Sequence, residues 1–140
     1  MIWHKDSLDI RTRGKGMYAF TNAVNDAIQT WDILEGMCFL FIKHTSASLC
    51  ISESYDPSAQ DDLETFLDRL VPEKQIWHCH TLEGPDDSPS HMRAILTDTD
   101  LTIPIDNGKL SLGTWQGVYL FEHRTRPHLR QILIRCMHAS

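Results

Sequence analysis

Three histidines stand in polar, turn-like segments where an imidazole could bind a metal ion. His44 ends an apolar strand-like run, His80 ends the run QIWHCH, and His91 lies in the expected first turn of a helix. Imidazoles in such places are ordinary metal ligands, and three protein ligands with an open position are typical of catalytic zinc sites. Histidines are also common at surfaces and helix ends, and no HExxH spacing is present. The spacing alone therefore leaves both a metal site and ordinary surface histidines open.

Carboxylates near these histidines could orient them or take part in catalysis. Asp86 and Asp87 precede the expected start of a helix, so they either favour the helix dipole or accept the second N–H of a ligating imidazole. Asp56 is predicted to cap a helix, because Pro57 follows it in a first helical position. Glu53 ends a strand without an evident structural role, which makes it the better candidate for a functional carboxylate.

Hydroxyl and guanidinium groups could bind an anion. Thr45, Ser46 and Ser48 are either turn residues or hydroxyl donors to a phosphate. Arg124, Arg126 and Arg130 could add charge for the same anion, although arginines beside the Pro127 turn are more often simply exposed. No Walker loop and no GxGxxG is present, so the sequence does not support a nucleotide site of either standard type.

Length and charge limit the functional classes. The chain has 140 residues, enough for one domain with its own core. It carries 19 acidic and 13 basic residues, for a formal net charge of -6. A general nucleic-acid binder presents a basic face, so we expect no nucleic-acid partner. A small phosphorylated molecule needs only a local pocket, which the net charge does not exclude.

The sequence also carries signals of compartment. Residues 1–16 are charged throughout and lack the apolar segment of a secretory signal. The longest apolar run, MCFLFI at 37–42, is far too short to cross a bilayer. The four cysteines have no CxxC spacing, and three of them lie in apolar strand-like runs. We therefore expect a cytoplasmic protein with reduced cysteines and no membrane partner.

These side chains must be positioned by strands, with about three helices inserted between them. The expected strands are 3–11, 16–20, 37–44, 47–53, 75–80, 101–105, 109–112, 114–123 and 130–137. The runs 37–44 and 47–53 are expected to form a hairpin or a tight connection, and the strands after residue 100 an antiparallel meander. Helices are expected at 22–34, from Pro57 to Leu70, and from Ser88 to Leu96. The predicted class is α+β, in one domain spanning residues 1–140.

A glycine pair interrupts one of these strands. Gly113 and Gly117 flank Thr-Trp-Gln within LSLGTWQGVYLFEH. Glycine in a strand usually marks a bulge, a bend or the close approach of another backbone or a ligand. Trp115 is interpreted as a structural ring. Gln116, on the opposite face, is either a residue of a site or interface or simply exposed to solvent.

Three segments together resemble the YjbQ-like family, which is named for a secondary thiamine-phosphate synthase activity. They are HTSASLCISESYDP (44–57), HTLEGPDDSPSHMRAIL (80–96) and LTIPIDNGKLSLGTWQGVYLFEHR (101–124), in the order and spacing of that family. The GTWQ block with its upstream LxLG is the most specific of these motifs. The resemblance covers nearly the whole chain. It implies a compact α+β fold with a β-sandwich or barrel-like core, assembled as a homotrimer.

The resemblance also implies a site near the GTWQ block, at a subunit boundary. The three family histidines fall on His44, His80 and His91, and we expect them to hold a divalent metal. Their ligand type favours zinc, with magnesium as the alternative for diphosphate chemistry. The remaining implied site residues are Glu53, Asp87 and Gln116 for catalysis, and Thr45, Ser46, Ser48 and Arg124 for binding a substrate anion.

This chain departs from the family pattern in two places. Ser52-Glu53-Ser54 stands where the family commonly has Asn-Glu-Asn, so the carboxylate is kept without its flanking amides. The segment EHRTRPHLRQ, at 122–131, varies widely in the family. Arg124 is therefore the site residue that the resemblance carries over least directly.

Two functions follow from these residues. The first is a metal-dependent enzyme that acts on a small phosphorylated molecule, with thiamine-phosphate synthesis, which joins a pyrimidine diphosphate to a thiazole phosphate, as the implied reaction. Such chemistry needs a metal ion or other cations, because negative charge develops on the leaving diphosphate in the transition state. The second is a trimeric protein that binds a metal or a small anion without catalysis. It would use the same histidines but would need no open coordination position and no general base.

Overall fold

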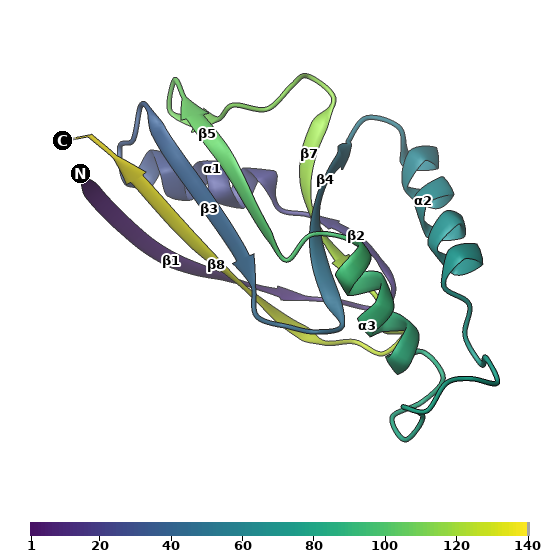
Figure 1. Cartoon of the computed structure of the whole chain (residues 1–140). Coiled ribbons are helices and arrows are strands. Elements are labelled where there is room, and N and C mark those ends of the chain that lie inside the picture. Colours follow the sequence, from purple (N-terminus) through teal and green to yellow (C-terminus); the bar gives the residue numbers. More distant parts are fainter. Residues whose placement is uncertain (140) are drawn as a thin grey trace.

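Two curled antiparallel sheets form the framework of the protein (Figure 1), seen here in a computed structural model that describes residues 1–139. The five-stranded sheet has the order β1-β8-β3-β5-β6, and the three-stranded sheet has the order β2-β7-β4. The strands are β1 (Ile2–Arg11), β2 (Gly16–Ala19), β3 (Gly36–Ile42), β4 (Ala47–Glu53), β5 (Asp100–Asp106), β6 (Lys109–Leu110), β7 (Gln116–Glu122) and β8 (Leu129–His138). The two chain ends lie side by side, because β1 and β8 pair along their whole length.

Three helices complete the domain. They are α1 (Thr21–Thr30), α2 (Pro57–Leu70) and α3 (Asp87–Leu96). α1 contacts β6 and β7, while α3 contacts β4. In Figure 1, α2 and α3 lie at the end of the molecule away from the chain termini, with the connection between them looping out below. Among residues 1–139, none of the helices has the length and apolar character that a bilayer crossing requires.

The core forms because each element buries one apolar face. β5 alternates between exposed and buried residues along Asp100–Asp106, as a strand with one covered face should. In α1, Val24 and Ile28 are four residues apart and both fully buried. They join a cluster with core residues of both sheets, such as Leu40 and Leu120. The two sheets therefore share one core, and the fold class is α+β, as predicted.

The helix predictions agree with the structure in number and in order. Asp56 caps α2 by accepting a hydrogen bond from the Ser58 amide at 2.9 Å, and Pro57 is the first helical residue. α1 ends at Thr30 rather than at residue 34. Asp32 then takes a positive φ of 56°, which turns the chain toward β3.

Two strand predictions were wrong, and of the two alternatives for 37–44 and 47–53 one was right. Residues 75–80 contain no strand, and the turn at 76–77 leaves Ile76 and Trp77 exposed. β3 and β4 are joined by a tight connection, residues 43–46, and do not form a hairpin, since β3 belongs to the five-stranded sheet and β4 to the other. The strands after residue 100 do not form a meander either. Only β5 and β6 pair as neighbours, while β7 lies between β2 and β4, and β8 lies between β1 and β3. Alternation predicts a strand but carries no information about its partner.

The two glycines of the GTWQG segment have different settings. Gly113 precedes β7 in a turn, where the Gln116 side chain accepts a hydrogen bond from its amide at 2.8 Å. Gly117 lies inside β7, opposite Ser52. A Cβ at Gly117 would lie 2.9 Å from the Ser54 Cβ and 3.1 Å from a ring carbon of Tyr119. A close approach therefore occurs at Gly117, but the approaching groups are side chains of the same chain rather than the backbone or ligand expected from the sequence.

We expect Gly117→Ala to destabilise the fold, because its methyl group would overlap the Ser54 Cβ inside a packed strand pair. The loss should be about 1–3 kcal/mol in the free energy of unfolding. Denaturant-induced unfolding measures it as a lower transition midpoint at unchanged slope. Gly113→Ala is the matched control, since its methyl group would meet only the movable Gln116 side chain, at 3.3 Å. Equal losses in the two variants would contradict the argument.

Candidate functional site

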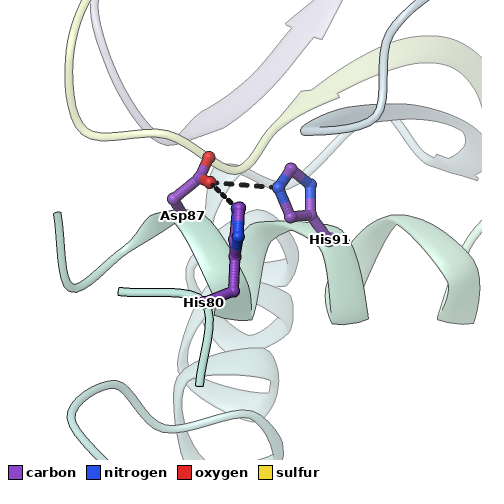
Figure 2. A group of neighbouring side chains, drawn as sticks. All are labelled: His80, Asp87 and His91. Atoms are coloured by element: carbon purple, nitrogen blue, oxygen red, sulfur yellow. Dashed lines mark hydrogen bonds and ion pairs between the residues drawn. The ribbon is translucent and has the colours of Figure 1, made fainter. Parts of the chain in front are cut away.

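Two histidines and a carboxylate converge at the start of α3 (Figure 2). The Asp87 Oδ2 atom lies 2.7 Å from the Nε2 atom of His80 and 3.1 Å from the Nε2 atom of His91. One ligand atom of each residue lies within 4.8 Å of the others. Asp87 is buried, whereas the side chains of His80 and His91 are 55% and 37% exposed. The group is therefore open to solvent on the imidazole side only.

The local sequence places these side chains together. Asp87 and His91 are four residues apart, so one turn of α3 puts them on the same face. His80 comes from the irregular segment before the helix and meets them from the side (Figure 2). Gly84, at φ 101°, lies in the turn that reverses this segment toward α3. Residues 75–80, which were predicted as a strand, form part of this irregular segment, and His80 at its end contacts Asp87.

The ring of His91 is held from both sides. Its Nδ1 atom lies 2.8 Å from the backbone oxygen of Thr45, and a carbonyl oxygen can only accept a hydrogen bond. Nδ1 therefore carries a proton. In the protonated ring Nε2 also donates, to Asp87 at 3.1 Å, whereas in the neutral ring Nε2 has a free lone pair that could bind a cation placed beside Asp87. A histidine whose second nitrogen donates to a carbonyl is the usual arrangement of a metal ligand.

Arg124 fixes the other side of Asp87. Its Nη1 atom donates to Asp87 Oδ1 at 2.6 Å, and its Nε atom donates to Asp86 Oδ2 at 3.0 Å. Its Nη2 atom donates to the carbonyl oxygen of Glu83 at 3.0 Å. All three nitrogens of this buried guanidinium therefore have protein acceptors. Arg124 orients Asp87 and is not directed at a substrate anion.

Asp87 remains ionised in spite of its burial. Desolvation by itself would raise the pKa of this carboxyl. The hydrogen bond from His80 and the charges of His91 and Arg124 outweigh desolvation, and the pKa lies below its ordinary value. When both imidazoles are neutral, the carboxylates of Asp86 and Asp87 exceed the single charge of Arg124, and the remaining negative charge favours a bound cation.

His44 lines the same pocket but does not belong to the three-residue group. Its Nε2 atom accepts a hydrogen bond from the Gln131 amide at 2.9 Å, which leaves the proton on Nδ1. Partial burial, followed by the positive charge of Arg130, lowers the pKa of His44. His44 is therefore a neutral hydrogen-bond donor at the wall of the pocket. As the structure stands, it does not direct a free lone pair toward His80 and His91.

A pocket of about 570 Å³ opens beside this group. Its polar wall includes His44, Thr45, His80, Ser88, His91 and Thr99, and its apolar wall is formed by Ala47, Ala94 and Ile95. This volume is in the range of sites for small ligands, which combine apolar walls with a few polar groups. The predicted residues His44, Thr45, His80 and His91 thus share one pocket, with Asp87 bonded to two of its histidines.

Ser46 and Ser48 lie in the interior instead. The Ser46 hydroxyl accepts a hydrogen bond from Arg130 at 2.8 Å, and Arg130 also pairs with Glu122. The Ser48 hydroxyl lies 2.8 Å from the Nε2 atom of His123. Both serine side chains are buried and engaged within the protein. The structure therefore does not present them to a substrate phosphate.

The interpretation that the C-terminal arginines are exposed was wrong for Arg124 and Arg130, which are 5% and 3% exposed. Sequence reasoning also missed Glu122 and His123, which come at the end of the apolar run of β7 and are fully buried. Three charged or polar residues in succession directly after an apolar run were the available signal. They turn inward because Arg130 and Asp86 provide the opposite charges for Glu122 and Arg124.

Glu53 and Gln116 lie far from the histidines. They face each other across β4 and β7 at one end of the smaller sheet, whereas Ala47 and Glu122 pair at the other end. At about 3.3 Å per residue, the length of β4 separates these ends by about 20 Å. Glu53 accepts hydrogen bonds from the Asp56 amide at 3.0 and 3.2 Å. One chain therefore does not bring Glu53 and Gln116 to the histidine–carboxylate group.

The protein is a small α+β domain with two curled antiparallel sheets. Its candidate ligand site is the histidine–carboxylate group beside an open pocket. The sequence model described as UPF0047 protein YjbQ-like matches residues 6–139, and the chain belongs to this family. The resemblance stated from the sequence motifs is thereby confirmed.

Individual relatives agree with this assignment. The chain is 46% identical to UPF0047 protein sll1880 of Synechocystis sp. over 131 residues, which cover 94% of this chain and 89% of the relative. It is 34% identical to UPF0047 protein YjbQ of Escherichia coli O157:H7 over 133 residues, covering 94% and 96%. The solved structure of the conserved hypothetical protein TT1486 from Thermus thermophilus has a TM-score of 0.85 at 31% identity and covers 94% of this chain and 99% of its own.

The stability of the protein should fall in mild acid because of His123. Burial, followed by the charge of Arg93, lowers the pKa of His123 to about 3, whereas an unfolded histidine titrates near 6.5. In mild acid the unfolded chain therefore binds a proton on this histidine, whereas the folded chain does not. The free energy of unfolding has its full value above about pH 6.5 and decreases as the pH falls toward 3. Between pH 7 and pH 5 we expect a loss of about 2 kcal/mol from this residue.

His123→Gln is the matched variant, because glutamine is polar, neutral and of similar size. Denaturant unfolding at pH 7, 6 and 5 should show a shallower pH dependence for the variant than for the wild-type protein. The other histidines and the carboxylates contribute equally to both curves. Parallel curves would show that His123 does not carry the effect.

Proposed function

We propose that this protein is a metal-dependent enzyme that acts on a small phosphorylated molecule. The proposal places a divalent transition metal on His80, Asp87 and His91. The convergence of these three side chains carries it, with the Asp87 oxygen 2.7 and 3.1 Å from the two Nε2 atoms (Figure 2). Two imidazole nitrogens and one carboxylate oxygen form the donor set of many catalytic zinc sites. Non-haem iron(II) uses the same set.

The residues present fit such an ion. Thr45 holds the proton of His91 on Nδ1, so Nε2 of the neutral ring is ready to act as a ligand. Arg124 holds Asp87 through Oδ1 and leaves Oδ2 directed at the histidines. Nitrogen donors favour zinc over magnesium, which prefers oxygen ligands. His44, whose Nε2 atom is already occupied, is proposed as a hydrogen-bond donor to the substrate rather than as a third histidine ligand.

The pocket limits the substrate class. Its apolar wall of Ala47, Ala94 and Ile95 fits the carbon skeleton of a small molecule. Arg124 and Arg130 are bonded to carboxylates, so neither offers charge to a phosphate in the pocket. A bound metal would supply the charge that stabilises a leaving diphosphate or activates a water molecule. Transfer to or hydrolysis of a phosphorylated compound therefore suits the site, and thiamine-phosphate synthesis is one such reaction.

We further propose that the protein works as a homotrimer. An apolar groove beside the pocket is lined by Leu70, Trp77, Met92, Ile95 and Leu96, together with Val71 and Pro72. Trp77 is 62% and Ile95 83% exposed, and soluble monomers rarely leave such neighbouring apolar side chains in contact with water. Assembly would cover these side chains. It would also allow Glu53 and Gln116 of one copy to approach the histidine group of another, which a single chain keeps about 20 Å away.

Ile95→Glu is expected to weaken this assembly, because it puts a charge into the covered groove. Light scattering coupled to size exclusion should give the wild-type protein a mass of about three times the 16.1 kDa chain. The variant should shift toward the monomer while keeping its circular dichroism spectrum. Asp61→Lys, on the exposed side of α2, is the charge-changing control. A monomeric wild-type protein in the micromolar range would contradict the trimer.

The metal content of the untagged protein is the direct test of the site. We expect about one transition metal per chain in the wild-type protein, and loss of about tenfold or more in affinity in His80→Ala and His91→Ala, because each removes one of three ligands. His44→Ala should keep the metal. Wild-type protein that binds no zinc after incubation and dialysis would exclude the proposed ligand set.

Catalysis is separated from binding by a screen of phosphorylated compounds with the loaded protein. An enzyme should lose turnover in Glu53→Ala and Gln116→Ala while these variants keep both the metal and the trimer. A metal- or anion-binding protein, the second hypothesis, would show no turnover with any compound in the screen. Thiamine-phosphate synthesis, with zinc and with magnesium, belongs in the first round.

A further inference from the structure

A second pair of histidines lies at the opposite end of the molecule. His4 belongs to β1 and His138 ends β8, where the two chain termini lie together (Figure 1). Their Nε2 atoms are 3.0 Å apart. The strand register places Ile2 opposite His138, so His4 and His138 are diagonal neighbours across the strand pair. They are 134 positions apart in the chain, which makes this pairing invisible in the sequence.

The rings are held rather than loose. The two imidazoles have centroids 5.1 Å apart and planes inclined by only 13°. His4 stacks on Trp31, with centroids 5.0 Å apart and planes inclined by 19°. Trp31 directly follows α1, so the helix end supports the pair from the other side. This packing directs the two Nε2 atoms at each other and reduces the ordering cost of binding a shared ligand.

We propose that His4 and His138 form a second metal site, for a divalent transition ion bound by both Nε2 atoms. Two imidazole nitrogens that face each other can share one proton or one cation, and both side chains are only half-buried, so an ion can enter. Imidazole is a good ligand for copper, nickel and zinc. The remaining coordination positions are open to water or to an external donor.

The choice of ion follows the general order of affinity for nitrogen ligands. The 3.0 Å separation is that of a hydrogen bond between the two rings, and an ion would replace the proton of that bond. Copper(II) is the strongest binder of the divalent series and suits imidazole ligands, so it is the preferred ion.

This site is independent of the proposed function. It uses neither His80 nor His91, and its two ligands lie at the end of the molecule away from α3 (Figure 1). Among residues 1–139, the only group that offers three metal ligands together is His80, Asp87 and His91. We therefore expect the site of His4 and His138 to bind more weakly, and to prefer copper where the first site prefers zinc.

The test is a copper(II) titration of the untagged full chain, with the three-residue site blocked by His80→Ala. Calorimetry should show one copper per chain, with binding about tenfold weaker or more in His4→Gln and in His138→Gln. Zinc should bind this site about tenfold more weakly than copper. Because Trp31 stacks on His4, bound copper should quench its fluorescence, and Trp31→Phe should remove most of the quenching while binding persists in the calorimeter.

His128→Gln is the matched control, because it removes a half-exposed histidine outside the pair. It should bind copper as the His80→Ala parent does. Melting curves without metal establish that each variant is folded. Unchanged copper affinity in both His4→Gln and His138→Gln would overturn the proposal, as would equal losses in His128→Gln, which would indicate unspecific binding by surface histidines.

Discussion

The site depends on charges that are buried together at the end of β7. Glu122 is fully buried and accepts hydrogen bonds from Arg130 and from Thr12, the latter at 2.7 Å. Two residues further along, Arg124 pairs with Asp86 and Asp87. Removing one partner of such a buried pair costs about 3–5 kcal/mol, because the other charge remains without compensation. These ion pairs therefore specify how the smaller sheet, β8 and the start of α3 fit together.

The same pairing connects the core to the histidine–carboxylate group. Arg124 belongs to the segment that leaves β7, and its guanidinium reaches across to the first residue of α3. Asp87 is thereby fixed through one oxygen, and its other oxygen is directed at His80 and His91. A carboxylate held in this way is preorganised, and preorganisation is what allows a few side chains to bind a small cation tightly. The partly exposed histidines can respond to a ligand while their anchor stays in place.

The two histidine pairs of the molecule show how ligand geometry separates similar residues. His80 and His91 share a carboxylate, which supplies negative charge and a third donor atom. His4 and His138 face each other directly and are supported by the Trp31 ring. The first arrangement offers three donor atoms on two side-chain types, and the second offers two imidazole nitrogens. The difference comes from the neighbours of the imidazoles, because the imidazoles themselves are chemically alike.

The sequence by itself determined the helices, most of the strands and the family. The Asp56-Pro57 helix start, the alternating strands and the GTWQ block are local patterns, and local patterns follow from backbone sterics and from the burial of one face. Only the tertiary structure decided which strands pair, that residues 75–80 are a loop, and that Arg124 turns inward. The charge pairs and the meeting of His4 with His138 are contacts between residues far apart in the chain. Their energies depend on distance and burial in the folded protein, which no local pattern encodes.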